Sequence, residues 1–147
     1  MIDKEGINAA LGKVLAGGGA DRLLMPPPVF AAMRGEFIGF GRANKILTAR
    51  FPVLPEQLNP YGSMQGGMIG AAIDNTLGPL SMLVAPPNFI RRLELKYRRP
   101  VTAGLDYITV IGKFIEQKKR QLFFRASVVD HECNELANVK AVHWILD

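Results

Sequence analysis

NPYGSMQGGMIGAAIDNTLGPLSML, residues 59–83, joins a polar, glycine-bearing loop to an apolar segment of helical length. The segment after Gly67 has almost no polar stripe, and a helix of that kind must be buried on most sides. One carboxylate, Asp74, lies in the middle of it. Burying a charge is costly unless it is paired, and carboxylates with disturbed pKa values gather where chemistry is done. We therefore expect a buried helix around one acid that has a partner.

The same segment approaches the length of a membrane span. Asp74, Asn75 and Pro79 near its centre favour a protein interior instead. Pro79 cannot donate a backbone hydrogen bond, so we expect a kink or an end of the helix there. No basic run followed by an apolar core opens the sequence, and we predict a soluble cytoplasmic protein.

Composition narrows the class of protein. The chain has 147 residues, with 48% apolar and 21% charged residues, which suits one globular domain with a real core. A net charge of +5 is compatible with nucleic acid, a membrane surface or an anionic ligand, but no known nucleic-acid motif is present. Cys133 is the only cysteine, so no intrachain disulfide is expected. Neither His131 nor His143 has metal-ligand spacing to other residues, so we expect no metal site.

The pattern of the N-terminal residues indicates an accessory arm. Residues 17–19 are three glycines that should stop a helix, and residues 26–28 are three prolines that favour an extended chain. We predict a helical arm over residues 1–34 that acts as a lid or packing element. The helical spacing is carried by Ile7, Leu11, Val14 and Leu15.

In the rest of the chain, apolar and polar residues alternate as they do in strands. Two strands precede the helix and four follow it, the last three forming an antiparallel meander. A single apolar helix and a sheet of about six strands can bury each other's apolar faces if the sheet curls around the helix. The predicted strands cover residues 37–41, 45–51, 92–98, 106–115, 121–129 and 135–146.

The loop and helix together resemble a known family. Asn59, Gly62, Gln65-Gly66-Gly67 and Asp74 match the spacing found in hot-dog fold thioesterases, in the branch typified by the PaaI protein, over roughly residues 36–147. The family usually carries His where this chain has Gln65. A strand ending in Arg99-Pro100, followed by a small residue and Gly104, is also similar to the family.

This resemblance implies an α+β hot-dog fold over residues 35–147: an antiparallel sheet of about six strands wrapped around a long central helix, preceded by the N-terminal helical arm. It implies a homodimer, often paired further into a tetramer, with active sites at the subunit interface. The implied reaction is hydrolysis of an acyl-CoA thioester with no metal or organic cofactor, since coenzyme A is part of the substrate.

Each site residue then has an expected role. Asp74 would act as general base on water or attack the carbonyl directly. The Gly66 N–H at the helix start would donate to the oxyanion. The resemblance implies that Asn59 orients the water or Asp74, and that Gln65 donates a hydrogen bond near the thioester. An amide cannot titrate, so any step that needs the family's His as a proton carrier would be slow.

Other interpretations of the same residues stay open. Asp74 could be a buried structural carboxylate bonded to Thr76 or to loop amides. Asn59 could be an ordinary turn residue, and Gly66-Gly67 a tight junction. His131 is expected in a solvated turn, and His143 in sheet packing rather than catalysis.

The basic residues could form a solvated face or bind the phosphates of coenzyme A. For substrate binding we single out Gly67, Arg91, Arg92 and Arg99. The presence of Gln65 motivates a second hypothesis, a non-catalytic hot-dog protein that binds an acyl-CoA or similar ligand. A dehydratase or hydratase is a weaker third hypothesis.

Overall fold

A computed structural model describes residues 1–16 and 26–147, without the side chains of residues 15 and 16. The glycines 17–19, expected to end the first helix, lie outside the described residues. The elements are α1 Lys4–Ala16, α2 Pro28–Ala32, β1 Glu36–Gly41, β2 Ile46–Pro52, a 3-10 turn Pro55–Gln57, α3 Gly66–Val84, β3 Asn88–Tyr97, β4 Tyr107–Lys118, β5 Gln121–Val129 and β6 Glu135–Ile145.

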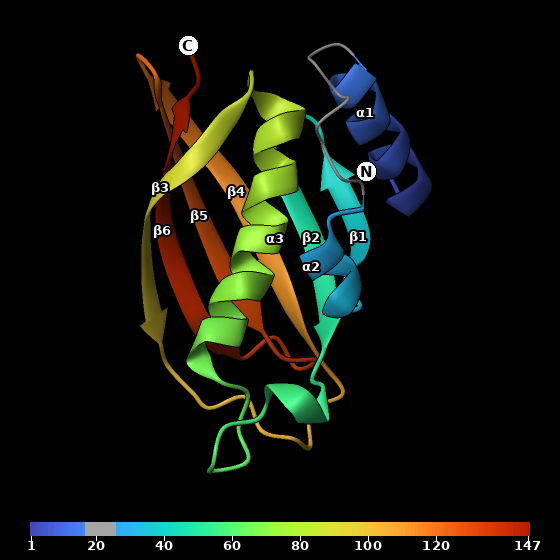
Figure 1. Ribbon diagram of the computed structural model, residues 1–147, viewed down its shortest axis with the longest axis vertical. Coiled ribbons are helices and arrows are strands. Elements are labelled where there is room, and N and C mark those ends of the chain that lie inside the picture. Colours follow the sequence, from blue (N-terminus) through green and yellow to red (C-terminus); the bar gives the residue numbers. More distant parts are fainter. Residues whose placement is uncertain (17–25) are drawn as a thin grey trace.

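All six strands form one antiparallel sheet in the order β1-β2-β4-β5-β6-β3, and the sheet curves around α3 (Figure 1). The predicted order of two strands, one helix and four strands is confirmed, as is the meander of the last three. Pairing of β3 with β6 leaves β3 at the edge of the sheet. That edge position bears directly on the site, because an edge strand presents backbone groups without partners.

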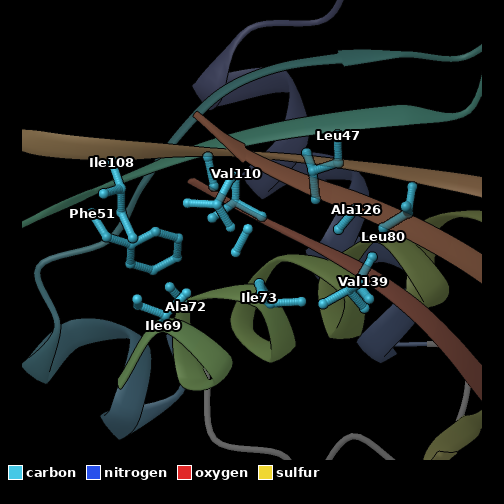
Figure 2. Packing of buried hydrophobic residues seen from close by; sticks show 14 of the residues in the cluster. Leu47, Phe51, Ile69, Ala72, Ile73, Leu80, Ile108, Val110, Ala126 and Val139 are labelled. Carbon is cyan, nitrogen blue, oxygen red and sulfur yellow. The ribbon is translucent and has the colours of Figure 1, made fainter. Parts of the chain in front are cut away.

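The core lies between α3 and the concave face of the sheet (Figure 2). Strand β5 and the first half of β4 bury every second residue, which is the period of a strand with one face covered. Helix α3 buries residues three and four positions apart, so one side of it meets the strands. The fully buried side chains include Leu47, Phe51, Ile73, Leu77, Leu80, Ile108, Val110 and Leu122.

The prediction that α3 is buried on most sides is wrong for the single chain. Gly67 and Asp74 are exposed, and Gly70, Ala71 and Gly78 on the same face are only partly covered. The face has no polar stripe because glycine and alanine form most of it, and such residues suit an interface as well as an interior. The helix also continues through Pro79 to Val84 and does not end at the proline.

The N-terminal segment packs against the domain. Ile7 and Leu11 of α1 are buried in the same cluster as the central helix. Backbone bonds of 2.7 and 2.8 Å tie Ile2 to Phe40 of β1. From α2, the Phe30 ring stacks on Phe37 with centroids 4.7 Å apart. The arm therefore covers the β1 end of the sheet.

Gly112 of β4 allows α3 to lie close to the sheet. A Cβ atom at this position would be 2.9 Å from Leu77 Cδ2, inside normal contact. We expect Gly112→Val to lower the free energy of unfolding by about 1–3 kcal/mol through overpacking, measured by urea titration. Gly12→Ala in α1 is the control, because a Cβ there meets nothing within 4 Å and alanine favours the helix. Equal stability of the two variants would contradict this packing account.

Candidate active site

The first turn of α3 offers two backbone donors. Gln65 is the N-cap, and its carbonyl accepts from the N–H groups of Met68 and Ile69 at 2.9 and 3.2 Å. Within the described residues, the N–H groups of Gly66 and Gly67 have no acceptor. The first N–H groups of a helix point outward and carry the positive end of its dipole. This turn can therefore hold an anion or an oxyanion.

Tyr97, at the end of β3, explains why residue 66 is glycine. Its hydroxyl donates to the Gly66 carbonyl at 2.7 Å, and a Cβ at residue 66 would lie 2.8 Å from the hydroxyl oxygen. Desolvation raises the pKa of the Tyr97 phenol, so it stays a donor at neutral pH. The sequence did not indicate that the Tyr97 hydroxyl contacts Gly66, because only the fold brings the end of β3 to the start of α3.

A cavity of about 510 Å³, which we call the amide cavity, lies beside this turn. Asn59, Gly66, Tyr97 and Arg99 line it, so the structure brings together three of the predicted site residues. The Asn59 Oδ1 accepts from the N–H groups of Tyr61 and Ser63 at 2.9 and 3.1 Å. In the single chain Asn59 therefore shapes the loop that leads into α3, as a turn residue does.

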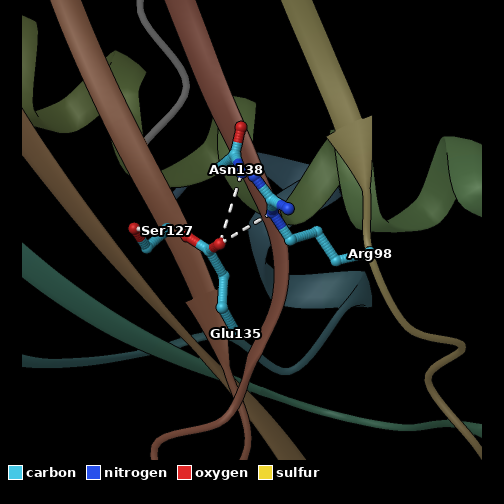
Figure 3. A network of polar contacts seen from close by, with 4 residues as sticks. All are labelled: Arg98, Ser127, Glu135 and Asn138. Carbon is cyan, nitrogen blue, oxygen red and sulfur yellow. Dashed lines mark hydrogen bonds and ion pairs between the residues drawn. The ribbon is translucent and has the colours of Figure 1, made fainter.

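Two neighbouring arginines at the amide cavity differ in their partners. The Arg98 Nε is 3.0 Å from Glu135 Oε2, and the Asn138 amide donates to the same oxygen at 3.3 Å (Figure 3). Arg99 makes no ion pair with any described residue, and its backbone N–H donates to the Leu136 carbonyl at 3.1 Å. No Asp or Glu lines the amide cavity, so Arg99 gives it a positive potential.

The other predicted substrate contacts lie elsewhere. Arg91 sits at a bulge in β3, with its guanidinium 4.6 Å from the centre of the Trp144 ring. The Arg92 Nε pairs with Glu94 at 3.2 Å, on the convex face of the sheet. Gln65 and Gly67 are exposed and do not line the amide cavity. The single chain thus brings neither Arg91 nor Arg92 to the α3 turn.

Asp74 borders a second cavity of about 260 Å³, which we call the acid cavity. Its carboxylate makes no hydrogen bond or ion pair with the described residues. Thr76, the structural partner considered above, instead donates to the Ala72 carbonyl at 2.9 Å. The carboxylate is open to solvent, yet the surrounding protein raises its pKa by desolvation. The acid cavity is lined by Pro27, Asp74, Asn75, Gly78, Pro79, Ser81, Met82, Asn88, Phe89, Ile90 and His143.

The two cavities are separated along α3. Asp74 lies eight positions after Gly66, which at about 1.5 Å per residue is about 12 Å along the helix axis. A hydrogen bond to an oxyanion and attack on its carbon both need distances of about 3 Å. One chain therefore cannot bring its own Asp74 and its own Gly66 N–H to the same carbonyl group.

Architecture and site together define an α+β protein of the hot-dog fold, and solved structures agree. The PaaI protein from the Escherichia coli phenylacetic acid degradation operon matches with a TM-score of 0.78, 13% identity and 96% coverage of both chains. The smu.793 protein from Streptococcus mutans UA159, bound to acetyl CoA, has a TM-score of 0.72 and 15% identity, covering 86% of this chain and 94% of its own. A hypothetical thioesterase from Streptococcus pneumoniae TIGR4 with coenzyme A has a TM-score of 0.72 and 15% identity, covering 80% and 90%.

The predicted resemblance to PaaI-like hot-dog thioesterases is confirmed at the level of the fold. No family model matches the sequence, and no curated protein matches it. None of the helices in residues 1–16 and 26–147 has both the length and the apolar character that a membrane crossing needs. Over the same residues, no three His, Cys, Asp or Glu side chains are grouped so as to hold a metal ion.

Proposed function

We propose that the protein is an acyl-CoA thioesterase. The observation that carries the proposal is at the start of α3. Among the residues that the structure describes, the N–H groups of Gly66 and Gly67 have no acceptor, and Arg99, which lines the cavity beside them, makes no ion pair. The N–H groups suit the oxyanion formed when a thioester carbonyl is attacked. Arg99 suits a phosphate of coenzyme A. The solved structures with acetyl CoA and coenzyme A share this fold, which supports the same class of ligand.

The active protein is, in this proposal, a homodimer. Strand β3 has one free edge, and two residues that face α3 on it, Leu93 and Tyr97, are 37% and 52% exposed. Pairing two β3 edges antiparallel about a two-fold axis would set two α3 helices side by side in opposite directions. Helices that cross at Gly70, midway between Gly66 and Asp74, would bring Asp74 of one chain to the Gly66 N–H of the other. Gly70 has no side chain to hold them apart.

The reaction follows from that arrangement. The thioester carbonyl oxygen accepts from the Gly66 N–H of one subunit, while Asp74 of the other subunit takes a proton from water that attacks the carbon. The C–S bond then breaks, and the thiolate of coenzyme A takes up a proton, giving a free acid and the thiol. Attack by Asp74 itself, through an anhydride that water opens, gives the same products. Gln65, exposed beside this turn, donates a hydrogen bond near the thioester but transfers no proton.

Thiol release across aromatic and straight-chain acyl-CoAs tests the activity. We expect turnover of at least one acyl-CoA, with free coenzyme A and free acid in equal amounts. Tight binding of acyl-CoA by calorimetry, with no thiol released, would contradict hydrolysis and favour the acyl-CoA binding protein that Gln65 suggested.

Leu93→Lys tests the proposed interface separately. A lysine there adds a charge to the face of β3 that would meet the second subunit, and burying an unpaired charge is costly. We expect the variant to be a folded monomer, with dissociation favoured by about tenfold or more, measured by sedimentation. The control is Ile115→Lys, because Ile115 is 42% exposed on β4, away from the free edge. Equal association of wild type and Leu93→Lys would contradict the β3 interface.

A further inference from the structure

A row of three cations crosses the face of the sheet that points away from α3. Lys113 of β4 is directly opposite Arg125 of β5, and Arg125 is directly opposite Lys140 of β6. All three side chains are exposed. Ala126 and Val139, the neighbours of two of them along β5 and β6, are buried in the core, so the cations lie on the convex face. We call these three residues the basic row.

The basic row is unfavourable in the protein alone. Directly opposite residues on neighbouring strands have Cβ atoms about 4.5–5.5 Å apart, and like charges at that separation lower stability. Arg125, in the middle, has a like charge on both sides. None of the three cations forms an ion pair with a residue in 1–16 or 26–147. An anion bound along the row would relieve the repulsion and supply the missing partners.

The two ends of the basic row limit the length of the anion. Across the sheet, the row ends at Ile46 of β2 on one side and at Glu94 of β3 on the other. Glu94 is directly opposite Lys140 but forms its ion pair with Arg92, at 3.2 Å. The charge of the row therefore spans three strands, or about 10 Å at a spacing of about 4.8 Å between strands. A nucleic acid or a membrane surface would extend past this span, so the row suits a short anion.

Along the strands the positive charge is confined as well. Side chains two positions apart share one face of a strand. Ser127 and Phe123 lie two positions on either side of Arg125, and both are neutral. On β6, the residues opposite them, Asn138 and Val142, are neutral too. Over β5 and β6 the charge is therefore one narrow band and not a broad basic surface.

A recess of about 240 Å³ opens beside the basic row. Arg125 and Lys140 line it, together with apolar side chains that include Phe123. Glu116 also lines it but forms an ion pair with Lys118 at 3.3 Å. The recess therefore offers a bound anion two cations of the row and partial shelter from water, which strengthens their attraction.

We propose that the basic row is a binding site for a short chain of linked phosphates, the chemistry shared by inorganic triphosphate and nucleoside triphosphates. Linked phosphates reach all three cations, whereas a single phosphate reaches two. The guanidinium of Arg125 matches two phosphate oxygens at once, and the lysines on either side act as point charges. The site lies on the other face of the sheet from α3, which borders both the amide cavity and the acid cavity. The inference therefore goes beyond the proposed hydrolysis.

Calorimetric titration of the whole chain tests the proposal. We expect inorganic triphosphate to bind at least about tenfold more tightly than orthophosphate or citrate at the same ionic strength, because it gains a further charge-assisted hydrogen bond. Arg125→Gln removes the central charge and should weaken triphosphate binding by about tenfold or more. Lys119→Gln makes the same change of net charge in the turn after β4 and should leave binding unchanged. ATP is titrated in the same way, and the tighter of ATP and triphosphate identifies the source of the phosphates.

A second measurement detects the repulsion itself and needs no ligand. At low salt, Arg125→Gln should raise Tm by about 2–4 °C, since it removes both like-charge pairs. The gain should shrink in about 1 M NaCl, where the Debye length is about 3 Å. Equal triphosphate affinity in wild type and Arg125→Gln, citrate bound as tightly as triphosphate, or an unchanged Tm overturns the inference. Neither measurement uses a thioester, so these outcomes leave the proposed hydrolysis untouched.

Discussion

Replacing Asp74 with alanine is expected to lower kcat/KM for thioester hydrolysis by about a thousandfold, or about 4 kcal/mol of transition-state stabilisation. The carboxylate is the acid residue lining the acid cavity and makes no bond within the described chain that would give it a structural role. Steady-state thiol release measures the effect. Asn75→Ala is the control, because Asn75 lines the same cavity but donates to the Ala71 carbonyl at 2.9 Å. An Asp74→Ala enzyme as active as wild type would exclude this mechanism.

The raised pKa of Asp74 gives this prediction a pH signature. The carboxylate is the active form, so kcat/KM should fall as the pH drops through a midpoint above the ordinary value of 3.8. The folded chain also binds that proton more tightly than the unfolded chain does. Asp74 therefore costs stability above its folded pKa, and the cost disappears as the pH falls through that value. Asp74→Asn should raise Tm at pH 7 more than at pH 4 while abolishing activity.

Removing a single backbone N–H donor should lower kcat/KM almost as much as Asp74→Ala does. Gly66→Pro deletes the N–H and leaves the helix intact, since proline is favoured at the first helical position and Gln65 has a ψ of 138°, which a following proline accepts. We expect kcat/KM to fall by about 10²–10³-fold, the loss typical of one oxyanion donor. Stopped-flow or steady-state thiol release measures it.

Gly66→Ala is the matched control for the missing donor. It introduces the same Cβ against the Tyr97 hydroxyl but keeps the N–H. If Gly66→Pro is no slower than Gly66→Ala, the effect belongs to the contact with Tyr97 and the oxyanion role is wrong.

The sequence predicted most of the fold because its signals are local. The alternation in 121–129 coincides with β5, and the glycine pair before an apolar run marks the start of α3 at Gly66. Two features depended on tertiary contacts instead. Pairing of β3 with β6 could not be read from either strand. The open face of α3 escaped prediction because Gly67 and Ala71 count as apolar yet cover little surface.

The residues of the candidate site were likewise predicted only in part from the sequence. Asn59 and Gly66 were predicted from the spacing of the motif and Arg99 from a cluster of basic residues, and all three line one cavity. Arg91 and Arg92 were chosen as nearby cations, but a bulge in β3 and the strand period turn them to the convex face. His143 gave only a weak signal, a lone polar residue among the buried positions of a strand. Its surroundings became visible only in the fold, where Asn88, 55 residues away in sequence, contacts His143 and both residues line the acid cavity.

Mixing two inactive variants tests most directly whether each active site draws on two subunits. Asp74→Ala and Gly66→Pro are each expected to be nearly inactive, and a mixed dimer has one site with both groups intact. After unfolding and refolding together at equal amounts, about half the dimers are mixed, so activity should return to about a quarter of the wild-type value. Activity no higher than the mean of the two variants would mean that Asp74 and Gly66 do not meet across an interface.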